Sequence, residues 1–149
     1  MTNEDYQLLK IFCDRHFEWY TPKYPTTPPG LPSKFLENIE KTSLSNAKKG
    51  LQQAINDMVE ETANWRPEAV AEADARFAAA GTFTLSEVRR RYSKKYLQIL
   101  KRGVIRSATE YYLLKGIRDG CGMETGATEG DQIEALMAAF EAKIMLQSP

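Results

Sequence analysis

The chain has 149 residues, of which 42% are hydrophobic and 27% are charged, and its formal net charge at pH 7 is zero. This length indicates one domain, and the composition excludes disorder over most of the chain. A chain of this size buries roughly two-thirds of its unfolded surface, so its stability requires neither disulfides nor a structural metal. The two cysteines, Cys13 and Cys121, are too few and too far apart for the disulfide framework of a secreted domain.

The sequence contains no segment that is typical of export or of membrane insertion. The first residues, MTNEDYQLLK, begin acidic and lack the apolar core of a signal peptide. No apolar run approaches the roughly 18 residues that a membrane-spanning helix needs. These features predict a soluble cytoplasmic protein with reduced thiols.

The apolar residues have helical spacing along nearly the whole chain. This pattern predicts an all-α fold, an irregular bundle of about six helices in a single domain over residues 1–149. Asn3 is the predicted cap of a first helix that runs to about Tyr20. A Pro-rich loop over residues 21–32 follows, because proline occupies five of the eleven positions in PKYPTTPPGLP.

The middle of the chain carries further helix-start signals. A short helix is predicted after Ser33, and a longer one begins after Ser43 or Ser45. Pro67 suits the first position of the next helix, which is rich in alanine and ends at Gly81.

Three capping boxes mark the starts of the last three predicted helices. They are TLSE at 84–87, SATE at 107–110 and DQIE at 131–134, in which the first side chain accepts a hydrogen bond from a backbone amide. The Gly-rich stretch GCGMETGATEG, residues 120–130, is predicted to be the loop before the last helix, and residues 147–149 a tail.

Basic residues are concentrated in one segment. Residues 85–118 contain ten lysines or arginines and two acids, whereas the rest of the chain contains ten bases and eighteen acids. A single helix over residues 85–102 would turn its apolar stripe toward the core and most of its bases toward solvent. The predicted basic face consists of Arg89, Arg90, Lys94, Lys101, Arg102 and Arg106.

Two other interpretations fit the same bases. They could contact the phosphates of a nucleic acid, or form an ordinary solvated face in which each surface ion pair contributes only about 0–1 kcal/mol. The acids that would pair with them are Asp57, Glu60, Glu61, Glu72 and Asp74. A helix-turn-helix is disfavoured, because the helix that would enter the major groove begins ATEYYLLKG, with an acid, two tyrosines and two leucines.

The Pro-rich loop is a second candidate binding surface. Tyr20 and Tyr24 lie at or within it, and an extended proline-rich segment is a common form of peptide recognition. The alternative that we favour is a loop that wraps around the bundle, with Tyr24 and Leu31 packed against it.

No catalytic or metal-binding set is complete in the sequence. Cys13 and His16 are three residues apart on the first predicted helix, but the chain has one histidine and no CxxC pair. We interpret them as a buried thiol and a histidine at the edge of the core. The Gly-rich stretch lacks the GK[ST] ending of a phosphate-binding loop. We therefore predict no catalytic residues, no metal and no cofactor, although an enzyme that combines Cys13, His16 and tyrosines near Tyr111 stays open.

These observations favour a small non-enzymatic protein that binds or regulates another protein through its basic face. An adaptor, or a neutraliser of a toxin or enzyme, is a role of this kind. The expected partner is a protein with an acidic surface. The alternative is a nucleic-acid-binding protein that contacts phosphates through the basic helix over residues 85–102. The sequence leaves the oligomeric state open.

Overall fold

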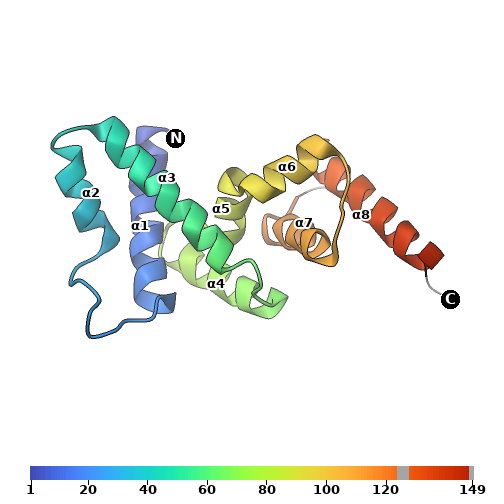
Figure 1. Ribbon diagram of the computed structural model, residues 1–149, viewed down its shortest axis with the longest axis horizontal. Coiled ribbons are helices and arrows are strands. Elements are labelled where there is room, and N and C mark those ends of the chain that lie inside the picture. Colours follow the sequence, from blue (N-terminus) through green and yellow to red (C-terminus); the bar gives the residue numbers. More distant parts are fainter. Residues whose placement is uncertain (124–127, 148–149) are drawn as a thin grey trace.

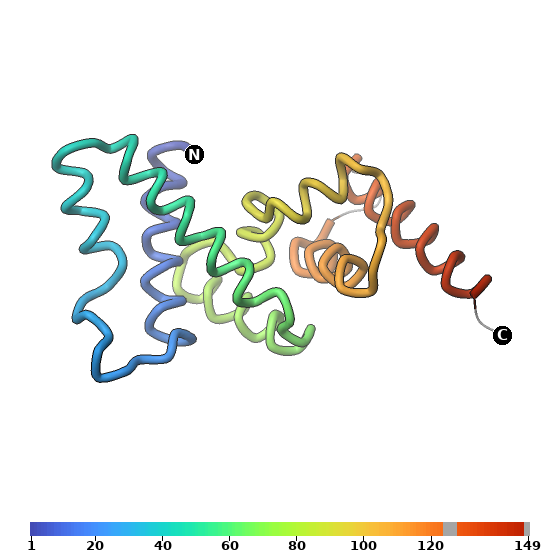
Figure 2. Tube along the Cα trace, viewed as in Figure 1, coloured from blue at the N-terminus to red at the C-terminus, as the bar shows by residue number. Residues whose placement is uncertain are grey.

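The computed structural model describes residues 1–123 and 128–147, and every regular element in these ranges is an α-helix. The predicted all-α fold class is confirmed, with eight helices in the described ranges in place of about six. None of these helices is long and apolar enough to cross a membrane. Figures 1 and 2 show α1 to α4 at one end of the molecule, α6 to α8 at the other, and α5 between them. In chain order the helices are α1 (Asn3–Tyr20), α2 (Pro32–Glu40), α3 (Leu44–Glu61), α4 (Pro67–Ala79), α5 (Leu85–Tyr92), α6 (Lys94–Arg102), α7 (Ala108–Gly120) and α8 (Thr128–Gln147).

Most helix starts lie where a side-chain hydroxyl caps the first turn. Ser43, Thr84 and Ser107 each accept a hydrogen bond from a first-turn amide of α3, α5 and α7 respectively, which confirms three predicted starts. The cap of α1 is Thr2, one residue before the predicted Asn3. Local hydrogen bonding therefore determines where these helices begin.

The predicted start of the last helix at Asp131 is wrong, because α8 begins at Thr128. Glu129, in the first turn of α8, accepts hydrogen bonds from Arg90 and Tyr96, which lie far away in the sequence. These contacts hold the first turn against α5 and α6. Acidic residues in a first turn are also stabilised by the helix dipole, so Asp131 belongs inside the turn.

The predicted Gly-rich loop is shorter than the sequence indicated. Gly120 is still the last residue of α7, and residues 128–130 already belong to α8. Residues 124–127, the centre of the predicted loop, lie outside the described residues. The predicted tail begins at Gln147, which is the last residue of α8, and residues 148–149 lie outside the described range.

One hydrophobic cluster joins α1 to α5. Phe12 of α1 and Phe77 of α4 stack with ring centroids 4.4 Å apart. Leu51 and Ile55 of α3 and Leu85 of α5 are fully buried in the same cluster. A fully buried side chain of this kind stabilises the fold by about 1.5–3 kcal/mol relative to exposure. Through this cluster α5 packs against the N-terminal helices α1 to α4.

A second hydrophobic cluster joins α6, α7 and α8. Tyr96 and Ile99 of α6 pack with Leu114 and Ile117 of α7 and with Ile133 of α8, and all five are fully buried. Their spacing of three residues on α6 and on α7 gives each helix one apolar stripe. The first cluster therefore contains the start of the basic segment, and the second contains its buried apolar residues from Tyr96 onward.

The helix predicted over residues 85–102 is two helices, because the chain is extended at Ser93. Its φ and ψ are −71° and 111°, and its hydroxyl accepts a hydrogen bond from the amide of Tyr96 at 3.2 Å. Ser93 therefore ends α5 and caps α6 at once. The break lets α5 bury its stripe in the first cluster and α6 bury its own in the second.

A close contact between α5 and α7 connects the two ends of the molecule. Ser86 donates its hydroxyl to Asp74 Oδ2 at 2.5 Å and its amide to Asp74 Oδ1 at 2.9 Å. Gly120 packs against this pair, and a Cβ atom added there would overlap the Ser86 hydroxyl. Glycine at this position is required by the approach of the two helices.

The Pro-rich loop does not pack against the bundle as we expected. Tyr24 is 66% exposed, which contradicts the prediction that it packs on the helices, whereas Leu31 is half-buried. Lys23 holds the start of the loop by donating to carbonyl oxygens at the end of α1, among them that of Phe17 at 2.9 Å. The loop is thus tied to the main chain of α1 and leaves Tyr24 in solvent.

Candidate functional site

The predicted basic face is divided among α5, α6 and the link to α7, and two of its arginines are in ion pairs. Arg90 Nη2 lies 2.8 Å from Glu129 Oε2, and Arg102 Nη2 lies 2.5 Å from Glu110 Oε1. These acids belong to α7 and α8. The pairing that a solvated face requires does occur, but with different acids from those on α3 and α4 that the sequence suggested.

Glu129 connects three helices through Arg90 of α5 and Tyr96 of α6. The Tyr96 hydroxyl donates to Glu129 Oε1 at 2.7 Å. Burial opposes ionisation of Glu129, but the hydrogen bonds from Arg90 and Tyr96 hold the pKa of this carboxyl below its usual value. Burial and the bond to Glu129 raise the pKa of Tyr96, so the phenol stays a donor. Arg90 thus has a structural role.

Arg89 was predicted to be on the exposed face, and this prediction is wrong because the side chain is 4% exposed. Its Nη2 donates to the carbonyl oxygen and to the hydroxyl of Thr62, the residue that ends α3. Burial lowers the pKa of Arg89, and the nearby charge of Asp74 opposes that shift. A helical wheel for one isolated helix places Arg89 on the side away from the core. In the fold, however, α3, α4 and α7 all contact α5, so that side is also covered.

The remaining predicted cations lie on an exposed surface. Lys94, Leu97, Gln98 and Lys101 are spaced by three and four residues, and all four are exposed; we call them the outer face of α6. Leu97 is 48% exposed, and neither lysine makes an ion pair with any described residue. Opposite them on the helix lie the buried residues of the second cluster. The outer face of α6 is therefore a solvent-facing stripe with an apolar centre.

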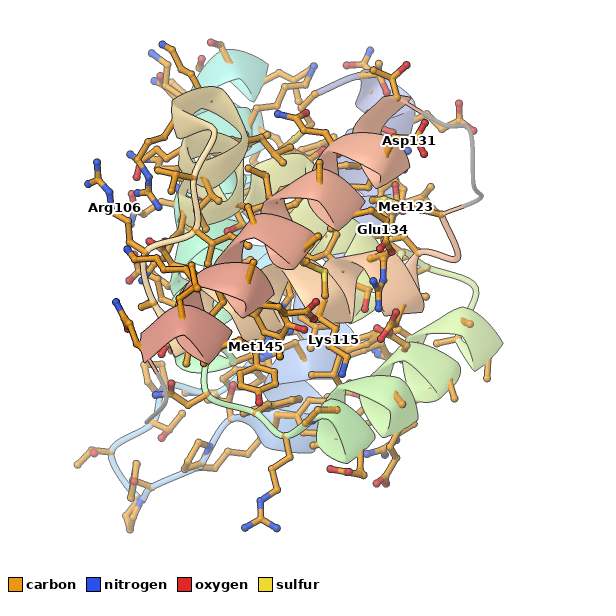
Figure 3. All side chains as sticks on the ribbon, turned by 90° about the vertical axis from the view of Figure 1, so that its right-hand side faces the viewer. Arg106, Lys115, Met123, Asp131, Glu134 and Met145 are labelled. Atoms are coloured by element: carbon orange, nitrogen blue, oxygen red, sulfur yellow. The ribbon has the colours of Figure 1, made fainter. Side chains whose placement is uncertain are left out.

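The link between α6 and α7 extends this surface. Val104 is 42% exposed, and the side chain of Arg106 projects away from the helices at the edge of the molecule (Figure 3). The backbone amide of Arg106 donates to Glu110 Oε1 at 2.8 Å, which holds the link in place. The sequence pattern places Leu97 near the polar side of the predicted helix, either packed on the next helix or exposed, and the structure shows it exposed.

The two tyrosines of the Pro-rich surface have different environments. Tyr20 is half-buried and packs edge-on against Trp65, with ring centroids 4.9 Å apart, whereas Tyr24 is exposed. The loop lies at the end of the molecule formed by α1 and α2, far from α6 (Figure 1). The fold therefore does not combine the two predicted binding surfaces into one.

The residues with catalytic potential do not form a site. Cys13 is buried in the first cluster, and His16 is buried next to Phe12 of that cluster. Burial raises the pKa of the Cys13 thiol to about 12 and lowers that of His16. A thiol with this pKa stays protonated at neutral pH and is a poor nucleophile. Tyr111 packs in the other cluster, against Phe140. Over residues 1–123 and 128–147, no group of three or more potential ligands could hold a metal ion.

Comparisons with models of protein families, with curated proteins and with solved structures found no match for this chain. Of the predicted basic face, three cations remain available to a partner: Lys94, Lys101 and Arg106.

Proposed function

We propose that the protein is a non-enzymatic module that binds an acidic surface of another protein through the outer face of α6 and Arg106. The observation that carries this proposal is the exposure of Lys94, Lys101 and Arg106, which pair with no acid of the described chain, beside the exposed Leu97. An adaptor or a neutraliser of an acidic target would use such a surface.

Charge and apolar area have separate parts in this recognition. Exposed ion pairs contribute about 0–1 kcal/mol each, so the cations mainly steer and orient an acidic partner. Leu97 and Val104 supply apolar area, and each square ångström removed from water contributes about 25 cal/mol. A surface that combines the two would bind a protein with acidic residues around a small apolar patch.

The same surface suits a nucleic acid less well. Phosphates need only the cations, and single-stranded bases need exposed aromatic side chains on which to stack. The outer face of α6 has no aromatic residue, and its centre is the aliphatic Leu97. This composition supports a protein partner over a nucleic acid.

The test is capture from a native cell extract with three forms of the protein. They are the wild type, the double variant Lys94→Glu with Lys101→Glu, and a control, Lys34→Glu with Lys41→Glu, which makes the same charge change on an exposed residue of α2 and on its exposed C-cap. Arg89 stays unchanged because it is buried. Circular dichroism establishes that all three are folded.

We expect a protein that the wild type and the α2 control retain and the α6 variant loses. The difference in retained partner between the wild type and the α6 variant should shrink at high salt, because salt screens exposed charges. If the wild type retains nucleic acid and the α6 variant does not, the surface binds phosphates and the proposal of a protein partner is wrong. Equal retention by all three forms, or none, would contradict the proposal and leave the α6 lysines as a solvated face.

A further inference from the structure

A cavity of about 380 Å³ lies between the two ends of the molecule, beside the buried Arg89. Its walls come from the link between α3 and α4, from α4, α5 and α7. Lys115 of α7 lines it on the side that faces α4 (Figure 3). Trp65, Val70 and Leu113 provide apolar wall, and the volume falls in the range of about 300–1,000 Å³ that is usual for small-molecule sites.

Arg89 is an unusual wall residue because it is buried with no described carboxylate within ion-pair distance, and the nearby charge of Asp74 offsets its burial only in part. Within the described part of the chain it makes no ion pair, and its buried Nε has no hydrogen-bond acceptor. Only Nη2 donates, to Thr62. Burying a charge that is only partly compensated is costly, so the guanidinium favours an incoming anion.

The acids at the same cavity do not satisfy Arg89. Both oxygens of Asp74 accept from Ser86, and Asp119 accepts from Arg118 Nε at 2.9 Å. Their negative charge still disfavours a multiply charged ligand. Lys115 also lines the cavity, but its side chain is exposed to solvent, so the buried guanidinium is the cation that a single negative charge would match best.

We propose that this cavity binds a small monocarboxylate with an apolar body, whose carboxylate accepts hydrogen bonds from Arg89 and whose body packs on Trp65, Val70 and Leu113. The carboxylate would accept from Nη1, because Nη2 already donates to Thr62 and Nε is enclosed by protein atoms. A ligand here would contact α4, α5 and α7 together, and so would bridge the two hydrophobic clusters. This site is separate from the outer face of α6, and its test is independent of the protein partner.

The first experiment is isothermal titration calorimetry with 4-phenylbutyrate, hexanoate and indole-3-propionate, and with the uncharged 4-phenyl-1-butanol as the matched neutral probe. Tryptophan fluorescence of a Trp19→Phe variant follows the same titrations, because Trp65 lines the cavity and is then the remaining tryptophan. At least one carboxylate should bind with one-to-one stoichiometry, change the Trp65 emission and bind more tightly than the alcohol.

Three variants locate the site. Arg89→Met keeps the length of the side chain and removes its charge, and should weaken carboxylate binding by about ten- to a hundredfold while leaving the alcohol unaffected. Gly116→Leu should abolish binding of both probes, because a Cβ at Gly116 meets no atom within 4 Å and a larger side chain can enter the cavity. Arg91→Met, on the exposed side of the same helix, should change neither affinity.

Two results would overturn the proposal. One is the absence of saturable binding by all three carboxylates to the wild type. The other is carboxylate affinity that stays unchanged in Gly116→Leu or in folded Arg89→Met. If Arg89→Met does not fold, two other measurements decide the outcome. They are binding to Gly116→Leu and the affinity of the wild type for the carboxylates compared with the alcohol, and both use a protein that keeps Arg89.

Discussion

Helices α5 and α6 carry similar numbers of bases, three and four, and have opposite surroundings. On α5, Arg89 is buried against Thr62, and Arg90 and Arg91 are paired with acids. On α6, Lys94 and Lys101 face solvent and pair with no described residue. Cations from one sequence segment therefore divide into structural groups and available groups.

The position of each helix in the fold explains the difference. Helix α5 lies between the hydrophobic clusters and contacts α3, α4 and α7, so its long side chains find carbonyls and carboxylates on neighbouring helices. Helix α6 lies at an edge and packs one side only, against α7 and the second cluster. The number of bases in a segment thus says little about which of them can bind a partner.

The largest expected effect comes from separating α5 from α7. Gly120→Ala should lower the free energy of unfolding by about 1–3 kcal/mol, because the added methyl overlaps the Ser86 hydroxyl and forces the helices apart. The matched change is Gly116→Ala on the same helix, where the methyl meets no atom within 4 Å. This variant should gain up to about 1 kcal/mol of helix propensity. Urea denaturation measures both, and equal effects would contradict the close contact at Gly120.

The next effect tests whether α5 is held by ion pairing. Glu129→Gln should lower the free energy of unfolding by about 1–2 kcal/mol at neutral pH, because it weakens the bonds to Arg90 and Tyr96. Urea denaturation of wild type and variant gives the difference. Glu141→Gln, which changes an exposed acid of α8 that accepts from Tyr111, is the control and should cost less.

The pH dependence of that difference has a definite sign. The pKa of Glu129 is lower in the folded protein than its ordinary value of 4.5, so its ionised form stabilises the fold. This stability is fully present above pH 4.5 and is lost as the pH falls through the folded pKa. The stability difference between wild type and Glu129→Gln should therefore shrink on acidification. A difference that grows below pH 4.5 would contradict the pairing.

The smallest effect compares the two helices directly. Replacing Arg90 and Arg91 together by alanine should cost about 1 kcal/mol, because each arginine loses a partly exposed ion pair. Replacing Lys94 and Lys101 together by alanine should change stability by less than about 0.5 kcal/mol. Thermal unfolding of the two double variants provides the comparison. A larger loss for the lysine pair would show that α6 is structural too.

Much of the fold was predictable because it depends on local patterns. The starts of α3, α5 and α7 follow from the hydroxyls of Ser43, Thr84 and Ser107, which need only their own first turn. The break at Ser93 was missed, although serine is a good cap. The apolar stripe on either side runs through it without interruption, so only the separate packing of α5 and α6 reveals it.

The candidate surfaces were predictable only in part. Lys94, Lys101 and Arg106 are exposed as predicted, because hydrated charges on an edge helix need no partner. The burial of Arg89 and the pairing of Arg90 with Glu129 were not predictable from local sequence. Both depend on groups at least 27 residues away. The cavity beside Arg89 is lined by residues from four segments, so no local sequence pattern predicts it.

The sequence by itself determined that this protein is helical, where most helices begin and which side chains prefer the core, because capping and amphipathic spacing act over three or four residues. Only the tertiary structure decided which charged side chains are buried or paired within the fold and which stay in solvent. That outcome depends on which helices pack together, and long-range contacts of this kind place Arg89 inside and leave the outer face of α6 in solvent.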